Sequence, residues 1–481
     1  MKRKVLGLLL SGMIILVGIV LESVADSTDR AQAKSTDNVS VKETTAKAST
    51  EEHIKKTVIK DVSNVKSGIK LKWKKIKDAS GYIIWRDNKK LTVIKNNKTI
   101  YTDKTAKTNG KKYYYRIESY KKSGNKTVKS GPSKKRGQYY LNGNRFDVIY
   151  MKGNTVYSKW TANVKAGGYE ILYAKKSDFS DAVTLTVSGK NNTGKNITLS
   201  NKSNYYFKIR NYRVTGKDNK KRTCYSPWSR VCTVINWNSS KEFAGNSVLH
   251  TDAVTLYRSY AAHRVKKVVC VNAGHGTVGG NSVKTLCHPD GSRKVTGGST
   301  AAGETKAAAV SSGTVLKNGV TEADANLSLA KILKDKLLAA GFDVLMIRDD
   351  KNVNIDNIAR TVFANEYADY HISLHYDSSE NDKGAFYIGV PQISSYLNMY
   401  PVSENYQKHK SLGENVLKGM REAGVKIYGS GCMALDLTQT SYSKIASIDI
   451  EVGDRASDTS YSTLEKIAEG ILKGIKHEAG M

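Results

Sequence analysis

Two histidines and two glutamates in the C-terminal half of the chain are of the types that perform metal-assisted hydrolysis. They are His275 in Ala-Gly-His-Gly, Glu322 at a predicted helix start, His375 in His-Ile-Ser-Leu-His, and Glu451 in Ile-Asp-Ile-Glu. Two imidazoles and a carboxylate offer zinc three ligands and leave a fourth position for water, as in catalytic zinc sites. A further glutamate can move the protons of that water. Because the four residues are spread from position 275 to position 451, their elements must bring them together.

Each of these residues also has an ordinary structural explanation when it is taken alone. His275 lies between two glycines directly after an apolar strand, where a lone histidine is more often structural than catalytic. The helix macrodipole favours Glu322 in a first turn, and Glu451 can be a strand-end carboxylate. Spacing alone therefore leaves both explanations open.

A second histidine, His371, lies four residues before His375. On a helix that spacing would place both imidazoles on one metal ion. The segment 370–375 is predicted to be a strand, however, in which four residues span about 13 Å. Two ligands of one zinc ion must each lie about 2 Å from it. We therefore expect His375, at the carboxyl end of the strand, to be the candidate ligand and His371 to be a packed or hydrogen-bonded inner residue.

The elements that carry these residues alternate between strand and helix, which predicts an α/β domain. One helix has the N-cap pair Thr321 and Asp324 and ends at Gly341, and a last helix, capped by Ser462 with Glu465, runs through residue 476. The first predicted strand of this α/β domain is continuously apolar, as strands of buried parallel sheets are. The predicted strands cover residues 268–271, 342–348, 370–375 and 447–452.

An internal repeat precedes this domain. Trp73 is followed after nine residues by Tyr82, and Trp160 is followed after nine residues by Tyr169. Each copy continues with an alternating Tyr-Tyr-x-x-Ile segment and ends in a turn that contains Ser and Pro. Short alternating strands with a period near 90 residues predict two tandem β-sandwiches. Over residues 57–237 the pattern resembles fibronectin type III modules, with the Trp in the core.

The first 56 residues differ from the rest. Residues 1–25 have a basic start, a short apolar run and small residues before position 26, which predicts a cleaved secretory signal. An uncleaved membrane anchor is the alternative, since the apolar run is near bilayer length. Residues 26–56 are rich in Ser, Thr, Lys, Ala and Asp and predict a solvated linker.

The five cysteines do not have the spacing of a disulfide framework. Cys224 and Cys232 either pair or remain reduced in strands. Cys270 is expected to pack in its strand. Cys287 and His288 are adjacent, but no Cys-x-x-Cys spacing supports a second metal site there.

The net charge of +33 lies almost entirely upstream, because residues 258–481 carry 26 basic and 25 acidic side chains. Such a field attracts polyanions. For a secreted protein we expect anionic wall polymers or a membrane surface rather than nucleic acid. A lysine-rich host proteome explains the same charge, so composition supports this localisation only weakly.

Together, the C-terminal segments resemble the zinc-dependent N-acetylmuramoyl-L-alanine amidases of bacterial cell walls. The resemblance spans residues 266–478 and contains four motifs in the order that the family has. The first is a strand that runs into Gly-His-Gly, and the last is a strand that ends in Glu and is nearly followed by Gly. The matching residues are His275; Glu322, Asn326, Leu327, Gly341, Val344 and Arg348; Arg360, Ala364, Asn365, Ala368, Asp369, Ile372, Ser373 and His375; and Glu451 with Gly453.

The resemblance implies a site and a reaction. It implies His275, Glu322 and His375 as ligands of Zn²⁺ and Glu451 as the catalytic carboxylate. The reaction that it implies is cleavage of the amide between the lactyl group of N-acetylmuramic acid and the L-alanine of the stem peptide in peptidoglycan.

The chain departs from the family at several places. Asn272-Ala273 stands where Asp-Pro is usual, His375 is followed by Tyr-Asp rather than Ala-Asn, and Glu451 is followed by Val-Gly-Asp rather than Gly-Phe. A long segment at about 277–318 separates the first two ligands and can be a lid, a substrate loop or a disordered stretch. These departures concern substrate preference and leave the metal set intact.

The sequence thus predicts a multidomain, secreted, wall-associated hydrolase. Two all-β sandwich modules, at 57–137 and 138–240, precede an α/β catalytic domain with a mostly parallel sheet at 266–481. A zinc peptidase that cuts peptidoglycan cross-links is an alternative on the same scaffold. A wall-binding or adhesion protein with a silent or weakly active domain is a third possibility, which the presence of all four key residues disfavours.

Overall fold

The computed structural model describes residues 53–216 and 221–481. The predicted signal at 1–25 and residues 26–52 of the predicted linker lie outside the described residues. Within the described residues, no helix combines the length and the apolar character that a membrane crossing requires.

The first repeat folds into two sheets that share one core. Trp73 packs its ring edge-on against Tyr82, with ring centroids 5.4 Å apart, and both side chains are buried. The first sheet contains β1 (Ile59–Val65), β2 (Gly68–Trp73) and β5 (Ile100–Asp103). The second contains β3 (Gly81–Arg86), β4 (Lys89–Lys95), β6 (Lys112–Ser123), β7 (Lys126–Lys129) and β8 (Arg136–Tyr139).

The second repeat pairs its strands in the same order, and Trp160 again meets Tyr169 edge-on, at 5.3 Å. Cys224 and Cys232 lie in neighbouring strands without a disulfide, and all five cysteines of the chain are free in the part that the structure describes. One sheet contains β9 (Val148–Lys152), β10 (Thr155–Lys159) and β13 (Gly194–Thr198). The other begins with β11 (Gly168–Ala174), β12 (Val183–Ser188), β14 (Tyr205–Thr215), β15 (Arg222–Tyr225) and β16 (Cys232–Ile235).

This second sheet continues into the α/β part of the chain through one short strand. The strand β17 (Val254–Tyr257) pairs with β16 on one side and with β21 (Asp343–Met346) on the other. Beyond β21 the order is β18 (Val268–Ala273), β22 (Tyr370–Asp377), β25 (Ala446–Asp454), β23 (Ala385–Gly389) and β24 (Ile427–Ala434). The pairs β21–β18, β18–β22, β22–β25 and β23–β24 are parallel, whereas β17–β21 and β25–β23 are antiparallel.

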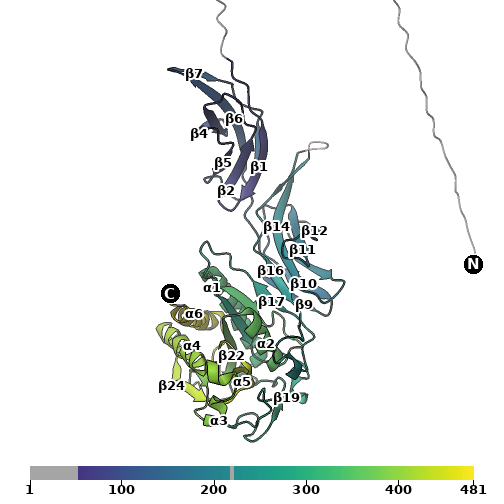
Figure 1. Ribbon diagram of the computed structural model, residues 1–481, viewed down its shortest axis with the longest axis vertical. Helices are drawn as coiled ribbons and strands as arrows, with labels where there is room; N and C mark the ends of the chain where they lie inside the picture. Colours follow the sequence, from purple (N-terminus) through teal and green to yellow (C-terminus); the bar gives the residue numbers. More distant parts are fainter. Residues whose placement is uncertain (1–52, 217–220) are drawn as a thin grey trace, which may run out of the picture. The chain divides into compact units, whose positions relative to one another are not determined.

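Helices cover both faces of this part of the sheet (Figure 1). Val269 and Val271 share a core with α1 (Glu322–Ala340), α4 (Val402–Glu422) and α6 (Tyr461–Glu478). Between them, Cys270 points to the other face and shares a core with α2 (Asn357–Tyr367). Burial on both faces explains why these strands are continuously apolar. The short helices are α3 (Ser394–Leu397) and α5 (Thr438–Tyr442).

The predicted ends of α1 are confirmed. The Thr321 side chain accepts a hydrogen bond from the Asp324 amide, and Gly341 ends the helix at φ 110°, a left-handed conformation that glycine adopts without strain. The predicted cap of α6 is wrong. Ser460 has the extended N-cap conformation and accepts from the Thr463 amide, while Ser462 already lies in the first turn.

A buried lysine joins α1 to the strands beside it. Lys334 donates to the Asp147 carbonyl at 2.7 Å and lies 3.4 Å from the Asp349 carboxylate, which also accepts from the Tyr257 hydroxyl. The side chains of Lys334 and Asp349 are only 2% and 1% exposed. A buried charge that loses its partner is strongly destabilising.

We therefore expect Lys334→Met to lower the free energy of unfolding by about 3–5 kcal/mol. Lys336→Met is the matched control, since Lys336 lies on the same helix in partly exposed pairs with Glu465 and Glu469, which are worth about 1 kcal/mol or less. Urea unfolding of both variants measures the difference. Equal losses in the two would contradict this assignment.

Candidate metal centre

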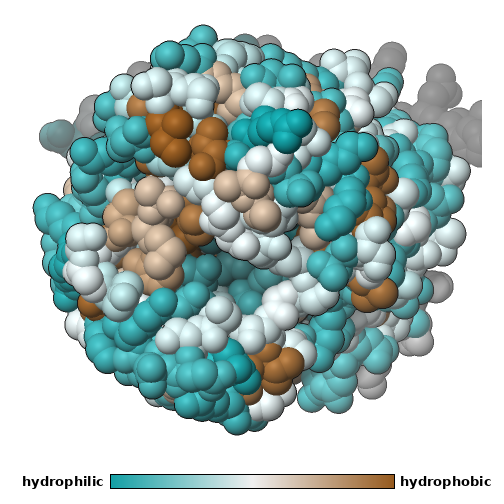
Figure 2. Space-filling model, turned by 90° about the horizontal axis from the view of Figure 1, so that it is seen from below, coloured by the Kyte–Doolittle hydropathy of each residue, from teal (hydrophilic) through white to brown (hydrophobic). Residues whose placement is uncertain are grey.

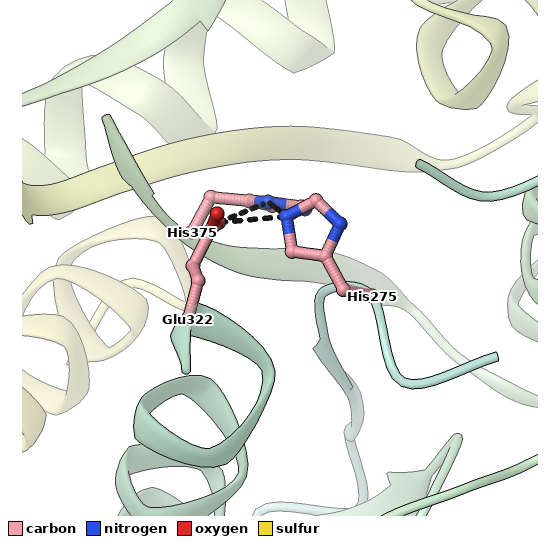
Figure 3. A group of neighbouring side chains, drawn as sticks. All are labelled: His275, Glu322 and His375. Atoms are coloured by element: carbon pink, nitrogen blue, oxygen red, sulfur yellow. Dashed lines mark hydrogen bonds and ion pairs between the residues drawn. The ribbon is translucent and has the colours of Figure 1, made fainter. Parts of the chain in front are cut away.

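Three side chains from three different elements converge on one point (Figure 3). His275 follows β18, Glu322 is the first residue of α1, and His375 lies near the carboxyl end of β22. His275 Nε2 lies 2.7 Å from Glu322 Oε1, and His375 Nδ1 lies 3.0 Å from each of these two atoms. In the described part of the chain this is the only group of three or more potential ligands that meets closely enough to hold a metal ion.

The backbone around His275 is shaped to let His375 approach. A Cβ on Gly274 would lie 2.2 Å from the imidazole of His375, so only glycine leaves room for that ring. His275 itself has φ 59° and Gly276 has φ 76°, both in the left-handed region. A non-glycine residue held there stores strain, which is a feature of functional sites. The Gly-His-Gly sequence therefore serves a close approach and a sharp turn.

Two buried arginines hold this turn by its carbonyl groups. Arg348 donates to the Gly274 carbonyl at 2.8 Å and to the Ala323 carbonyl at 2.6 Å. Arg360 donates to the His275 carbonyl at 2.7 Å. Burial lowers the pKa of Arg348 to about 10 and that of Arg360 to about 9. Because Arg348 binds both the turn and the first helical residues, it fixes His275 relative to Glu322.

The hydrogen bonds of His275 define which of its nitrogens can bind a metal. Its Nδ1 lies 2.8 Å from the Ser311 carbonyl, which can only accept, so Nδ1 carries the proton. The lone pair of Nε2 is then directed at the Glu322 oxygen and at His375 Nδ1. A cation at the centre of these acceptor atoms resolves their mutual repulsion. Ligands about 2 Å from a tetrahedral zinc lie roughly 3.3 Å apart, close to the spacing seen here, so the residues fit a zinc ion.

The carboxylate of Glu322 is held ionised. Burial opposes its charge, but the neighbouring imidazoles of His275 and His375 hold its pKa well below the usual range. The amide of Tyr376 donates to Oε1 at 3.1 Å, and the amide of Thr314 donates to Oε2 at 2.9 Å. Both oxygens are therefore oriented, as ligands of a metal need to be.

His375 lies in a strongly anionic setting. Burial disfavours its charged form, but Asp449 and Glu322 raise its pKa to about 10. A site that stabilises a positive charge so strongly also favours a divalent cation bound to the neutral ring.

Glu451 lies beside the three ligands rather than among them. It is the register partner of His375 across the β22–β25 pair. Its Oε2 is buried and has no hydrogen-bond partner among the described residues. Burial, followed by the nearby Asp449 and Glu322 charges, raises its pKa well above the usual range. A carboxyl group in this state, next to the ligands, is suited to take up and release a proton.

The segment 277–318, here termed the insertion, is part of the site. It contains the turn Gly280–Ser282 and the antiparallel pair β19 (Lys284–Leu286) and β20 (Lys306–Ala308). Ser311 and Thr314 from its end contact two of the three ligands through backbone atoms. The sequence did not predict either residue, because these contacts use a backbone carbonyl and a backbone amide, which do not depend on residue type.

The insertion is fixed at its other side by the buried Asp436. This carboxylate accepts hydrogen bonds from Lys294 at 2.6 Å, from Thr296 at 2.6 Å and from the Val295 amide at 2.7 Å, and His288 lies 3.2 Å away. Burial opposes its ionisation, but His288, Lys294 and Thr296 hold its pKa below the usual value. The ion pair therefore docks the insertion against the chain just after β24.

We expect Asp436→Asn to loosen the insertion, because it leaves Lys294, whose side chain is 9% exposed, without its counter-charge. Hydrogen exchange should then become at least tenfold faster at the amides of 284–308, and zinc affinity should fall as Ser311 and Thr314 lose their places. Asp382→Asn is the control, since that carboxylate is 60% exposed. Unchanged exchange would show that the docking does not depend on Asp436.

The other predicted residues lie elsewhere. His371 is completely buried, and neither ring nitrogen has a hydrogen-bond partner within the described ranges, as expected for a packed inner residue. Burial lowers its pKa to about 3. Cys287 is buried and free, and His288 binds Ser292 and Asp436 rather than a metal group.

Comparison with known proteins identifies a family for this part of the chain. Residues 269–477 match the family model described as N-acetylmuramoyl-L-alanine amidase. A search of curated proteins finds no match.

Solved structures of three amidases are similar to part of the chain. The N-acetylmuramyl-L-alanine amidase of Mycobacterium abscessus is 17% identical, over 44% of this chain and 98% of that one, with a TM-score of 0.36. The N-acetylmuramyl-L-alanine amidase of Mycobacterium smegmatis is 16% identical, over 46% of this chain and 99% of that one, with a TM-score of 0.37. The amidase of Nostoc punctiforme is 18% identical, over 45% of this chain and 98% of that one, with a TM-score of 0.32.

The residues matched by the family model contain His275, Glu322, His375 and Glu451, in the same region in which the structure brings the three ligands together. The chain is therefore an enzyme with an N-acetylmuramoyl-L-alanine amidase domain at residues 269–477.

Proposed function

We propose that this chain is a secreted peptidoglycan hydrolase in which His275, Glu322 and His375 hold a zinc ion and Glu451 is the general acid and base. The observation that carries the proposal is the convergence of three acceptor atoms, His275 Nε2, Glu322 Oε1 and His375 Nδ1, within 4.8 Å of one another. The match to the N-acetylmuramoyl-L-alanine amidase family supports the amide between N-acetylmuramic acid and L-alanine as the bond that is cut.

Amide hydrolysis needs a strong nucleophile and a stabilised oxyanion. Zinc, when bound, supplies both by lowering the pKa of its water to about 7 and by polarising the carbonyl. Glu451 accepts the proton of the attacking water and then delivers it to the nitrogen of L-alanine as the C–N bond breaks. The products are a carboxylate on the lactyl group and a stem peptide with a free amino terminus.

The residues around the ligands have separate tasks in this scheme. Arg348 and Arg360 keep the His275 turn in place, and Ser311 keeps the lone pair of His275 Nε2 directed at the ion. The amide of Thr314 keeps the Glu322 carboxylate from rotating. These contacts let the ligands meet the ion without reorganisation.

The substrate of this proposed reaction is a polymer. The face viewed in Figure 2 has a hollow with mostly hydrophilic and neutral walls and small hydrophobic patches at its rim. We propose that the two repeats are fibronectin type III-like modules and that their basic surface holds the enzyme on anionic wall polymers. On the second repeat, Arg210 lies over the rings of Tyr225 and Trp228, at 3.6 and 4.1 Å from their centroids, in favourable cation–π contacts.

The test is mass spectrometry of the products from purified peptidoglycan incubated with residues 26–481, with and without a zinc chelator. Chelator-sensitive release of intact stem peptides with free L-alanine amino termini supports the proposal. Cleavage at a peptide cross-link would assign the domain to the endopeptidase alternative. Absence of release under all zinc concentrations would favour a silent wall-binding protein.

A further inference from the structure

Asp449 is an acid beside the metal centre, with a side chain only 15% exposed, for which the scheme above has no use. On β25 the side chains alternate, so that Ile448 and Ile450 are buried in the core with 0% exposure while Asp449 and Glu451 point the other way. Asp449 Oδ1 is buried and has no hydrogen-bond partner among the residues that the structure describes. Burying a carboxylate oxygen without a hydrogen bond is costly, which indicates that Asp449 has a function at this position.

Asp449 forms an ion-pair contact with the ring of His375. Asp449 Oδ2 lies 3.6 Å from His375 Nε2, which is ion-pair distance and about half an ångström beyond a direct hydrogen bond. The other ring nitrogen, Nδ1, faces Glu322 and His275. If Nδ1 binds the metal ion through its lone pair, the proton of the neutral ring must be on Nε2. Nε2 is the ring nitrogen that lies 3.6 Å from Asp449 Oδ2.

Two other roles for Asp449 fit the geometry less well. It cannot be a further ligand of the same ion, because it lies at the ring nitrogen opposite to the one that faces Glu322 and His275. It is also a poor candidate for the proton carrier, because the group that it contacts is the ring of a proposed ligand. Glu451, the register partner of His375, is placed for that task.

We propose that Asp449 is a positioning residue whose carboxylate accepts the Nε2 proton of His375, fixes the tautomer and rotation of the ring, and thereby strengthens the binding of a divalent cation at Nδ1. Carboxylates behind metal-binding histidines act in this way, and their loss costs about 10–100-fold in metal affinity. His275 has the equivalent contact from the Ser311 carbonyl, so each imidazole is oriented from its far side. The inference rests on the proposed metal role of His375.

The experiment is competition for Zn²⁺ between the purified full chain and a chromophoric chelator, for the wild type, Asp449→Asn, Asp449→Ala and Glu451→Gln. We expect the two Asp449 variants to bind zinc about 10–100-fold more weakly than the wild type. Glu451→Gln, a change of the same size at the neighbouring position on the same face, should stay within about threefold of the wild type. Circular dichroism of each variant verifies that the fold is retained.

Activity as a function of zinc concentration separates positioning from proton transfer. The activity of Asp449→Asn should rise as zinc is added, whereas Glu451→Gln should stay inactive at every concentration. Wild-type zinc affinity in both Asp449 variants would overturn the positioning role while leaving the metal site in place. A wild-type chain that does not bind zinc would overturn both the metal site and this inference.

Discussion

Replacement of Glu451 by glutamine should lower the turnover of peptidoglycan by about 10³-fold, within the range of 10²–10⁴ that general acid–base groups contribute. Glutamine keeps the size of the side chain but can neither accept the proton of water nor protonate the leaving amine. Because Glu451 is outside the three-atom group, zinc should remain bound. Soluble stem peptide released per minute is the measured quantity, with zinc content determined on the same preparation.

The matched control for this variant is Glu465→Gln on α6. Its carboxylate is 49% exposed and lies 3.6 Å from Lys336, outside the site, so activity should stay within about twofold of the wild type. If Glu451→Gln retained full activity with zinc bound, another group would have to be the base.

Replacement of Gly274 by alanine should remove zinc binding and lower activity by at least 100-fold. The added methyl group would lie 2.2 Å from Cε1 and 2.4 Å from Nε2 of His375, so the ring must leave its place. A shift of about 1 Å in a catalytic group is enough to cost this much. Isothermal titration with Zn²⁺ and the release assay measure the two effects.

Gly245→Ala is the control for the methyl group itself. A Cβ on Gly245, in the turn Ala244–Asn246, meets no atom within 4 Å in the described structure. Zinc binding by the control and its loss in Gly274→Ala would tie the effect to the contact with His375. Normal zinc affinity in Gly274→Ala would mean that the turn can move without harm, contrary to the geometry described here.

Several strands and helix ends of the α/β part can be predicted, because they depend on residues close together in the sequence. The strand 268–271 is apolar on both faces, and Thr321 and Gly341 mark the ends of α1 by capping chemistry. The choice of His375 over His371 follows from strand geometry alone, and the structure places His371 in the interior. The two histidines and Glu322 meet, in contrast, because β18 and β22 are parallel neighbours and α1 begins beside them, and the sequence does not give this order of strands.

Other features depend on the path of the backbone, and the sequence does not predict them. The insertion contacts His275 and Glu322 through a carbonyl and an amide, which any residue type provides. The α6 cap was misplaced by two residues because Ser460 and Ser462 have the same chemistry and differ only in backbone conformation. The strand β17 links the second repeat to the α/β sheet and lies between the predicted ranges 138–240 and 266–481, so no predicted module contained it.

One departure from the family pattern can now be explained. Asn272, which stands where Asp is usual, is buried; its amide nitrogen donates to the Ser373 hydroxyl at 2.7 Å and its oxygen accepts from Arg360 at 3.1 Å. An amide satisfies both a donor and an acceptor between these two groups, which a carboxylate does not. The departure therefore concerns the support of the site and leaves the ligands unchanged.

The most direct test of the account is a crystal structure of zinc-soaked residues 53–481 with anomalous data collected at the zinc absorption edge. We expect one strong anomalous peak about 2.0–2.2 Å from His275 Nε2, Glu322 Oε1 and His375 Nδ1, with Glu451 outside the coordination shell. A peak at the other ring nitrogen of His375, between Asp449 and Glu451, or the lack of any peak at this centre would contradict it.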